Sequence, residues 1–213
     1  MTPEPVTLTG TLVRLEPLAQ AHAAELLSAL GTDPAIWRWM SGPALPDTSE
    51  SMAAYIAAAE AGRSRGTLLP FAQVDRRTGR AAGVTNYLHI SARDRGLEIG
   101  GTWLGRPWQR TGINTEAKYL LLRHAFEALG AVRIQIKTDG RNLQAQKAIA
   151  RLGAVREGTL RKHMRLHDGY IRDTVMYSVT DDEWPGVRAR LEGLLSAHGT
   201  RAGGGSDAAQ GSA

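Results

Sequence analysis

The chain has 213 residues, 42% of them hydrophobic, with no cysteine and a net charge of +5. This length suffices for one domain with a sizeable core, and the lack of cysteine excludes disulfides, thiolate zinc sites and cysteine nucleophiles. No apolar run of about 18 residues and no signal-like N-terminus occurs, so we expect no membrane span and a cytoplasmic location. The basic residues are interspersed with carboxylates, which favours a solvated basic surface or a polyanionic cofactor over a nucleic-acid partner.

The first half of the chain alternates between strand and helix patterns. Period-two and β-branched segments predict strands, and apolar residues at helical spacing predict helices. The predicted strands are Thr11–Pro17, Leu68–Asp75, Ala81–Ser91 and Gly96–Leu104, and the predicted helices are Ala19–Leu30 and Ser49–Gly62. Gly100 and Gly101 lie in the centre of the last strand, where they cannot pack a sheet face. They indicate a bulge or the close approach of another backbone.

The second half begins with the strongest helix pattern in the chain, Thr115–Leu129. The elements predicted after it are a strand Val132–Thr138, a helix Asn142–Leu152, two hairpin strands Val155–His167 and Tyr170–Thr180, and a closing helix Asp181–Leu195. Residues 198–213 are rich in Gly, Ser and Ala, which predicts a disordered tail after a single domain of residues 1–197. This order of elements predicts an α/β (α+β) fold with a mixed sheet and helices on both faces.

One segment, Pro107–Ala117, joins the glycine-containing strand to the strongest helix and contains the loop Gln109–Asn114. Unpaired backbone N–H groups and the helix dipole make such a junction suitable for a phosphate or pyrophosphate. Gly112 allows the backbone to come close to a ligand, and Arg110 could add charge-assisted contacts. An ordinary turn capped by Asn114 or Thr115 fits the same residues, and spacing alone leaves both alternatives open.

Within this loop, Gln109-x-x-Gly112-x-Asn114 resembles the acyl-CoA-binding motif of the GNAT superfamily. The strand Glu98–Leu104 resembles the splayed strand before that motif, and Asn142–Ala145 with Arg151–Ala154 resembles a later helix and turn of the family. The residues that resemble the RimJ/RimL-like branch are Glu157-Gly158, Arg161, Asp168-Gly169 and Arg172-Asp173. The resemblance covers roughly residues 6 to 195.

The resemblance implies a mostly antiparallel sheet that is splayed where the cofactor binds. It also implies an N-acetyltransferase that moves an acetyl group from acetyl-CoA to a primary amine by direct attack in a ternary complex. The acceptor would be a protein N-terminal amine or a small molecule such as an antibiotic or a polyamine. No metal is implied. Departures from the family pattern keep a second hypothesis open, in which the chain is a non-catalytic acyl-CoA-binding or interaction module.

The residues that the resemblance assigns to the cofactor fall into three groups. The backbone of the strand end would bind pantetheine, the loop would bind pyrophosphate, and the later helix would contact pantetheine and the adenosine phosphate. In that order they are Trp103, Leu104 and Gly105; Gln109, Arg110, Thr111, Gly112, Ile113, Asn114 and Thr115; and Asn142 and Lys147. Asn114 replaces the usual Gly or Ala, Ala145 replaces a frequent serine, and Ile149 stands where many relatives carry a tyrosine acid.

Acyl transfer to an amine needs a proton acceptor, an oxyanion donor and a proton for the leaving thiolate. Glu98 is the predicted base, although a salt-bridged structural glutamate fits the same position. A backbone N–H within residues 102–104 is the predicted oxyanion donor. Tyr177 is the predicted acid, with Tyr170 or water as alternatives.

The acceptor site is expected beside the first helices and the last hairpin, because these flank it in the resembled fold. Aromatic and imidazole side chains there could orient an amine. The candidates are Trp37, Trp39, Tyr87 and His163. His163 and His167 lie in a predicted strand about 13 Å apart, so we expect no metal between them. An exposed apolar face on the hairpin or the closing helix would permit a homodimer.

Overall fold

The computed structural model describes residues 1–42 and 44–203, with side chains up to residue 197. Within these residues, one eight-stranded sheet has the strand order β1-β2-β3-β4-β5-β6-β8-β7. All neighbouring strands pair antiparallel except β5 and β6, which are parallel. The strands are β1 (Leu8–Thr9), β2 (Val13–Pro17), β3 (Leu68–Asp75), β4 (Ala81–Ser91), β5 (Gly96–Leu104), β6 (Arg133–Asp139), β7 (Val155–Arg165) and β8 (Ile171–Thr180).

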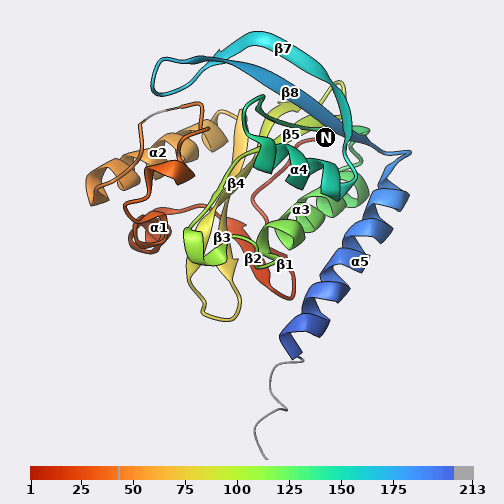
Figure 1. Ribbon diagram of the computed structural model, residues 1–213, viewed down its shortest axis with the longest axis horizontal. Coiled ribbons are helices and arrows are strands. Elements are labelled where there is room, and N and C mark those ends of the chain that lie inside the picture. The colour runs from red at the N-terminus through yellow and green to blue at the C-terminus, as the bar shows by residue number, and fades with distance from the viewer. Residues whose placement is uncertain (43, 204–213) are drawn as a thin grey trace, which may run out of the picture.

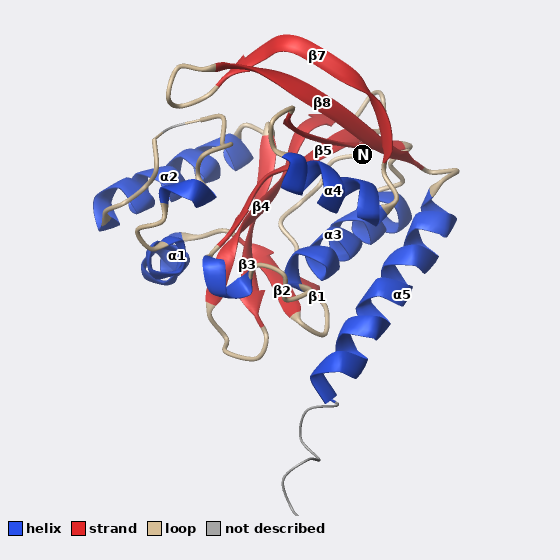
Figure 2. Cartoon of the chain, viewed as in Figure 1, coloured by secondary structure: helices blue, strands red, loops and turns tan. Residues whose placement is uncertain are grey.

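Helices cover both faces of the sheet (Figures 1 and 2). One face carries α1 (Ala23–Leu30) and α2 (Ser49–Ser64). The other carries α3 (Ile113–Arg123), α4 (Leu143–Leu152) and α5 (Trp184–Gly203). The predicted mixed, mostly antiparallel sheet with helices on both faces is therefore confirmed. Over the described residues, no helix combines the length and the apolar character needed to cross a bilayer.

The centre of the sheet is opened in two ways. The parallel pairing of β5 with β6 runs only from Gly96↔Arg133 to Glu98↔Gln135, and beyond it the two strands separate. The pairing of β4 with β5 shifts register between Val84 and Asn86, opposite Gly101, whose φ is +57°. Both the predicted splay and the predicted bulge are thus present, and both lie at the same part of β5.

Several elements differ from those predicted. The short strand β1 was not predicted, because two residues carry no periodicity. Helix α3 begins at Ile113, two residues before the predicted start at Thr115, because Gly112 adopts φ +88° and serves as the N-cap. Helix α5 runs to Gly203 instead of Leu195, so residues 198–203 of the predicted tail are helical. The rest of that tail, 204–213, lies outside the described residues, and its disorder stays a prediction.

Two hydrophobic clusters sandwich the sheet. The larger lies between the sheet and α3 and α5, and includes Ile99, Leu121 and Leu191, each 0% exposed. The smaller lies under α1 and α2 and includes Leu26 and Ile56, also 0% exposed. Because α3 packs on the sheet directly below the splay, the start of this helix is held firmly at the opening.

Glu116, in the first turn of α3, ties the helix to the start of β2. Its carboxylate accepts backbone N–H bonds from Thr11, Leu12 and Val13 at 2.8, 2.6 and 2.7 Å. Gly10 leaves the space that this carboxylate fills, since a Cβ there would lie 2.4 Å from its carboxyl carbon. The contact fixes the register of the first strands against the helix that begins at the loop.

Glu116→Gln is expected to lower the free energy of unfolding by about 2 to 3 kcal/mol, because one acceptor oxygen becomes an N–H facing N–H donors. Urea unfolding measures the loss. Glu50→Gln, in the exposed first turn of α2, is the matched control and should change stability by about 0.5 kcal/mol or less. Equal effects for the two variants would contradict this role of Glu116.

Candidate functional site

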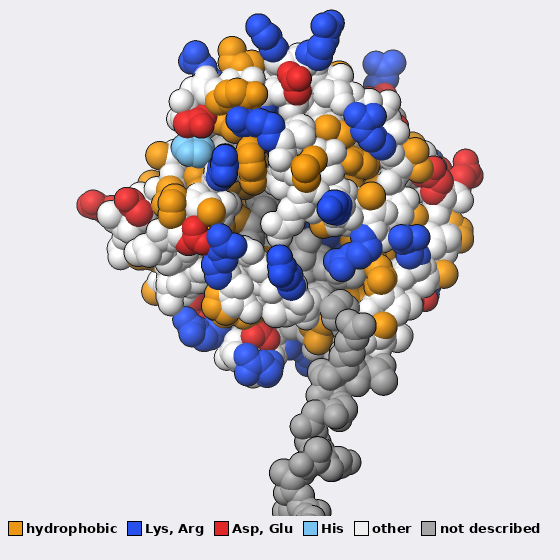
Figure 3. All heavy atoms as spheres, viewed as in Figure 1, with side chains coloured by type: hydrophobic (Ala, Val, Ile, Leu, Met, Phe, Trp, Pro, Cys, Tyr) orange, Lys and Arg blue, Asp and Glu red, His pale blue; other side chains and the backbone are white. Residues whose placement is uncertain are grey.

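A cleft of about 550 Å³ opens at the point where β5 and β6 separate. Its walls come from α2, β3, β4, β5, α3, β6, α4, β7 and β8, together with the segment between α1 and α2. In the space-filling view, Lys and Arg side chains are spread around the hollow between α2 and α4 (Figure 3). The opening is thus built by the splay itself, and residues far apart in the sequence meet there.

Glu98 lies in this cleft with only 1% of its surface exposed. Its Oε2 accepts a hydrogen bond from Nε2 of Gln135 at 2.9 Å and pairs with Nζ of Lys137 at the same distance. His89 approaches the same oxygen at 3.8 Å. Gln135 and Lys137 alternate on one face of β6, which brings both to the carboxylate. A buried carboxylate held in place by these partners is suitably placed to receive a proton from a molecule in the cleft.

Gly100 gives the Glu98 carboxylate its space. The two residues are two apart on β5 and share a face, and a Cβ at Gly100 would lie 2.6 Å from Oε1 of Glu98. Asn86 of β4 donates to the carbonyl oxygens of Gly100 and Gly101 at 3.1 and 3.2 Å, which holds the bulge. The glycine pair that interrupts the strand pattern therefore makes room for the carboxylate and shapes the cleft floor.

Lys118 reaches the cleft from α3, although it is only 5% exposed. Its Nζ lies 2.6 Å from Oγ1 of Thr102 and 3.1 Å from Oγ1 of Thr85, the two residues at the bulge. No described carboxylate pairs with it, and burial lowers its pKa from 10.5 to about 7. Near neutral pH the cleft therefore holds a lysine that is partly uncharged.

The loop before α3 is shaped by its own side chains. Nε2 of Gln109 donates to the carbonyl of Leu104 at 2.9 Å, and Oγ1 of Thr111 donates to the carbonyl of Trp108 at 2.7 Å. Arg110 has φ +64° and Gly112 has φ +88°, so the chain turns sharply into the helix. In the described part of the chain, no side chain caps the N-terminus of α3. The capped-turn alternative is therefore wrong, and the first N–H groups of α3 stay available to an anion.

Asn114 supplies a second sign of a ligand at this loop. It lines the cleft, and its Oδ1 is buried without a hydrogen-bond partner in the described chain. A buried acceptor in that state is costly unless a donor from outside the chain reaches it. Across the cleft, Asn142 also lines the wall while its side chain caps α4 through Ala145 N–H at 3.0 Å. The open helix start and the orphaned oxygen fit a ligand that carries both phosphate and amide groups, as the pantetheine diphosphate of Coenzyme A does.

The predicted cofactor residues occupy different parts of this region. Gly105 N–H is already bonded to the carbonyl of Ala82 at 2.9 Å, and the carbonyls of Trp103 and Leu104 accept from Gln73 and Gln109. Their backbone bonds hold the end of β5 in the sheet and the loop. Thr115 is buried, with its Oγ1 accepting from Arg151 at 3.1 Å. Ile113 is buried in the core below the loop.

Arg110, Thr111 and Lys147 are exposed. None of the three lines the cleft. They are accessible to a ligand that extends out of the cleft over the loop and α4, and their assigned contacts stay predictions.

Tyr87 and Tyr177, predicted for acceptor binding and for proton donation, do not line the cleft. Tyr87 is 0% exposed, and its hydroxyl donates to the carbonyl of Leu121 at 2.6 Å in the core. Tyr87 therefore cannot contact an acceptor. Its predicted role in acceptor binding is wrong, because the packing of α3 on β4 places this side chain in the core. Tyr177 is 4% exposed and its hydroxyl lies 3.5 Å from Gln146 of α4. Since Tyr177 is not part of the cleft wall, the structure does not bring it together with Glu98.

Trp37 and Trp39 both line the cleft, as their prediction requires. Trp37 packs edge-on to Tyr55 and Trp103, with ring centroids 5.7 and 6.1 Å apart. His163 is exposed on β7. It is not among the residues that line the cleft. Partial burial, and after it the positive charges of Lys137 and Arg172, lower the pKa of its imidazole.

Reasoning from the sequence missed several residues of the described cleft wall, among them Tyr55, Lys118, Lys137 and Arg172. Two of these carry a readable signal. Lys118 is four residues after Asn114 and so shares its helix face, and Lys137 alternates with Gln135 away from the apolar face of its strand. Arg172 belongs to the RimJ/RimL-like resemblance, but nothing in the sequence placed it in a site. Tyr55 carries no signal, and the positions of both residues depend on how α2 and β8 meet the sheet. Among the described residues, no three His, Asp or Glu side chains gather as a metal site.

Comparison with known proteins identifies the domain that carries this cleft. Residues 13–155 match the model of the acetyltransferase (GNAT) domain family. A solved structure described as an acetyltransferase from T. thermophilus is 42% identical and superposes with a TM-score of 0.82, over 92% of this chain and 100% of that one. The family match includes β5, the loop and α3.

Two further relatives carry more specific names. A Bacillus subtilis (strain 168) protein named as a ribosomal N-acetyltransferase, YdaF, is 30% identical over 110 residues. These residues are 52% of this chain and 59% of that protein, so the match spans less than two thirds of the relative. Mycobacterium smegmatis RimJ, solved in complex with CoA-disulfide, shares the fold with a TM-score of 0.79 at 24% identity, over 90% of this chain and 95% of that one.

Proposed function

The chain belongs to the GNAT acetyltransferase family and is an acetyl-CoA-dependent acyltransferase. On this premise we propose that it acetylates a primary amine, and that a protein N-terminus is the first candidate acceptor. The observation that carries the proposal is the position of Glu98. Its carboxylate is buried in the cleft opened by the splay, and the uncapped start of α3 borders the same cleft. A proton acceptor and an anion site thus share one cavity.

The proposed cofactor site uses the start of α3 and the two asparagines. The N–H groups after Gly112 would hold the diphosphate, and the orphaned Oδ1 of Asn114 would accept from an amide N–H of the pantetheine arm. The edge of β5 that β6 leaves unpaired after Glu98 offers further backbone groups to that arm. Acetyl-CoA supplies the acetyl group as a thioester.

The proposed reaction is a direct transfer within the cleft. The amine nitrogen attacks the thioester carbonyl carbon, so that a C–N bond forms and the C–S bond breaks. Glu98 takes the proton that the amine loses, directly or through water. A backbone N–H within residues 102–104 is the proposed donor to the oxyanion. Ile149, which lines the cleft and is 7% exposed, has no proton to give, so water is the proposed source of the thiolate proton.

A thiol-release assay tests the function. The full chain is incubated with acetyl-CoA and a panel of peptides with free N-termini, polyamines and aminoglycosides, and product masses are recorded. Turnover that depends on an amine and adds 42 Da, the mass of one acetyl group in place of a hydrogen, supports an N-acetyltransferase. The B. subtilis relative named as a ribosomal N-acetyltransferase is the reason to begin with peptides from ribosomal protein N-termini. Binding of Coenzyme A without turnover for any amine would favour a non-catalytic acyl-CoA-binding module instead.

Gly112→Val is expected to weaken acetyl-CoA binding about 30-fold, because a β-branched residue at φ +88° strains the loop and places bulk beside the diphosphate. Isothermal titration measures the affinity. Gly169→Val is a closely matched control, since Gly169 has the same φ of +88° in the β7–β8 turn and nothing within 4 Å of its Cβ position. If both variants bind acetyl-CoA like the unmodified chain, the diphosphate does not sit on Gly112.

A cytoplasmic location and a homodimer are further parts of the proposal. The B. subtilis relative's name suggests a ribosomal protein as its substrate, which supports the cytoplasm. The outer strand β7 and the start of β8 expose Leu160 (45%) and Ile171 (48%), which would suit an apolar contact between two copies. Light scattering at several concentrations would test the dimer.

A further inference from the structure

The charges around the cleft do not balance. Among the described residues, the Lys, Arg, Asp and Glu side chains that line it are Glu98, Lys118, Lys137 and Arg172. The carboxylate in this set is already paired with Lys137 at 2.9 Å. Burial lowers the pKa of Lys118, so that this lysine is partly uncharged near neutral pH. An arginine stays charged at that pH. Arg172 is therefore the cation of the cleft wall whose charge is least compensated.

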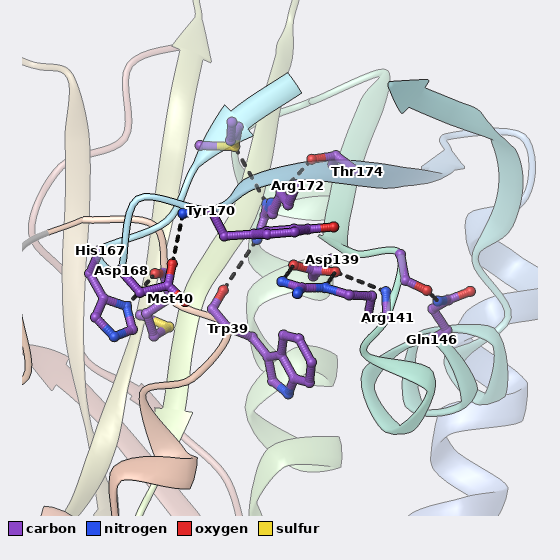
Figure 4. Close-up of polar contacts among 12 residues, drawn as sticks. Trp39, Met40, Asp139, Arg141, Gln146, His167, Asp168, Tyr170, Arg172 and Thr174 are labelled. Carbon is purple, nitrogen blue, oxygen red and sulfur yellow. Dashed lines mark hydrogen bonds and ion pairs between the residues drawn. The ribbon is translucent and has the colours of Figure 1, made fainter. Parts of the chain in front are cut away.

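Arg172 is unusually deep for such a residue, with 4% of its surface exposed. Its guanidinium donates to Oγ1 of Thr174 at 3.1 Å, to the carbonyl of Trp39 at 3.2 Å and to the sulfur of Met164 at 3.4 Å (Figure 4). All three partners are uncharged. Burying a cation against neutral groups is costly unless an anion joins them.

The two carboxylates that attract Arg172 electrostatically, Asp139 and Glu98, are already paired with other cations. Asp139 forms its own ion pair with Arg141, whose guanidinium stacks between the rings of Tyr170 and Trp39 at 3.6 and 5.0 Å (Figure 4). Asp139 and Glu98 raise the pKa of Arg172 only through longer-range attraction, which is weaker than the lowering by burial. Neither forms an ion pair with it.

The position of Arg172 links it to the acceptor and not to the diphosphate. Its guanidinium donates a hydrogen bond to the carbonyl of Trp39, in the segment between α1 and α2. Trp39 and Met164 of β7 both line the cleft. The residues that border the proposed diphosphate and pantetheine sites, Asn114 and Asn142, lie on other elements, at the starts of α3 and α4. Since Glu98 acts on Arg172 electrostatically, an amine near Glu98 and an anion at Arg172 can belong to one molecule.

We propose that Arg172 binds a carboxylate of the acceptor, so that the substrates of this chain are amines that also carry a carboxylate. The proposal rests on the proposed function and narrows its acceptor. Guanidinium and carboxylate match in shape and charge, and the pair forms two parallel hydrogen bonds. Two sources supply that chemistry: a peptide N-terminus followed by an acidic residue, or a free amino acid. Polyamines and aminoglycosides, which carry only positive charges, would be repelled.

The test compares matched acceptors with the unmodified full chain. One pair is the peptide amides Ala-Asp-Gly and Ala-Asn-Gly, and the other is alanine and alaninamide, all compared at equal concentrations of neutral amine. We expect kcat/KM to be at least about 10-fold higher for the acid in one pair, which corresponds to roughly 1.4 kcal/mol. The pair that responds identifies the source of the carboxylate. Turnover with equal rates for acid and amide in both pairs overturns the proposal while leaving the acetyltransferase function intact; no turnover with any amine overturns the function itself.

Substitutions at Arg172 test whether this residue causes the preference for acceptors that carry a carboxylate. Arg172→Gln should bring the acid-to-amide ratio close to 1 by raising KM for the acid, with acetyl-CoA affinity unchanged. Arg172→Lys keeps the charge without the paired geometry and should retain part of the ratio. Arg156→Gln, on the exposed part of β7, is the matched control and should keep the full ratio. A full ratio in Arg172→Gln would overturn the assignment, and the comparison in the unmodified chain decides the substrate class even if that variant fails to fold.

Discussion

Glu98→Gln is expected to lower kcat about 100-fold at neutral pH with little change in acetyl-CoA affinity. Glutamine has the same shape and can keep contacts with Gln135 and Lys137, but it cannot take up a proton. Loss of a general base usually costs between 10² and 10⁴ in rate. Steady-state thiol release with a saturating amine measures kcat, and isothermal titration measures the affinity for acetyl-CoA.

Two controls separate proton transfer from structural damage. Glu157→Gln changes an exposed glutamate of β7 that pairs with Arg133 outside the cleft, and it should retain kcat. An amine that is already neutral at the assay pH needs less help from a base, so the defect of Glu98→Gln should shrink with such an acceptor. A variant that retains more than half of the activity would show that Glu98 is a structural, salt-bridged glutamate, the alternative that its sequence position left open.

Lys118→Met is expected to change how stability depends on pH. In the folded chain burial lowers the pKa of Lys118 to about 7, whereas the unfolded value is near 10.5. Between these values the unfolded chain binds more protons, so this residue makes stability rise with pH across that window and contributes no slope below it. The integrated effect is roughly 5 kcal/mol at most, at about 1.4 kcal/mol per pH unit. The Lys118→Met variant should lose this rise.

Urea unfolding at pH 7 and pH 9.5 measures the rise, and comparing the two chains cancels the titration of other groups. The free energy of unfolding of Lys118→Met minus that of the unmodified chain should be higher at pH 7 than at pH 9.5. The pH-independent loss of the contacts with Thr85 and Thr102 drops out of that difference. Lys147→Met, at an exposed position of α4, should show no pH-dependent difference in stability from the unmodified chain. Parallel pH profiles for Lys118→Met and the unmodified chain would mean that Lys118 keeps its ordinary pKa.

Much of the fold was predictable because local chemistry decides it. The alternation of β6, the Asn142 cap of α4 and the Asp168-Gly169 turn each set their element through neighbours within a few residues. The glycine pair in β5 correctly indicated a bulge. Helix ends were less predictable: the start of α3 depends on the left-handed backbone of Gly112, which allows the helix to begin before Thr115.

The sequence by itself indicated the family, the candidate anion-binding loop and the candidate base Glu98, since loop, helix start and Glu98 lie within about twenty consecutive residues. Only the tertiary structure decided what surrounds them. Tyr87 goes to the core and Tyr177 stays out of the cleft, whereas Lys118 and Arg172 enter it. The physical reason is that a side chain's environment depends on elements distant in sequence: β6 leaves β5 after Glu98, and β8 brings Arg172 to the carbonyl of Trp39, 133 residues earlier.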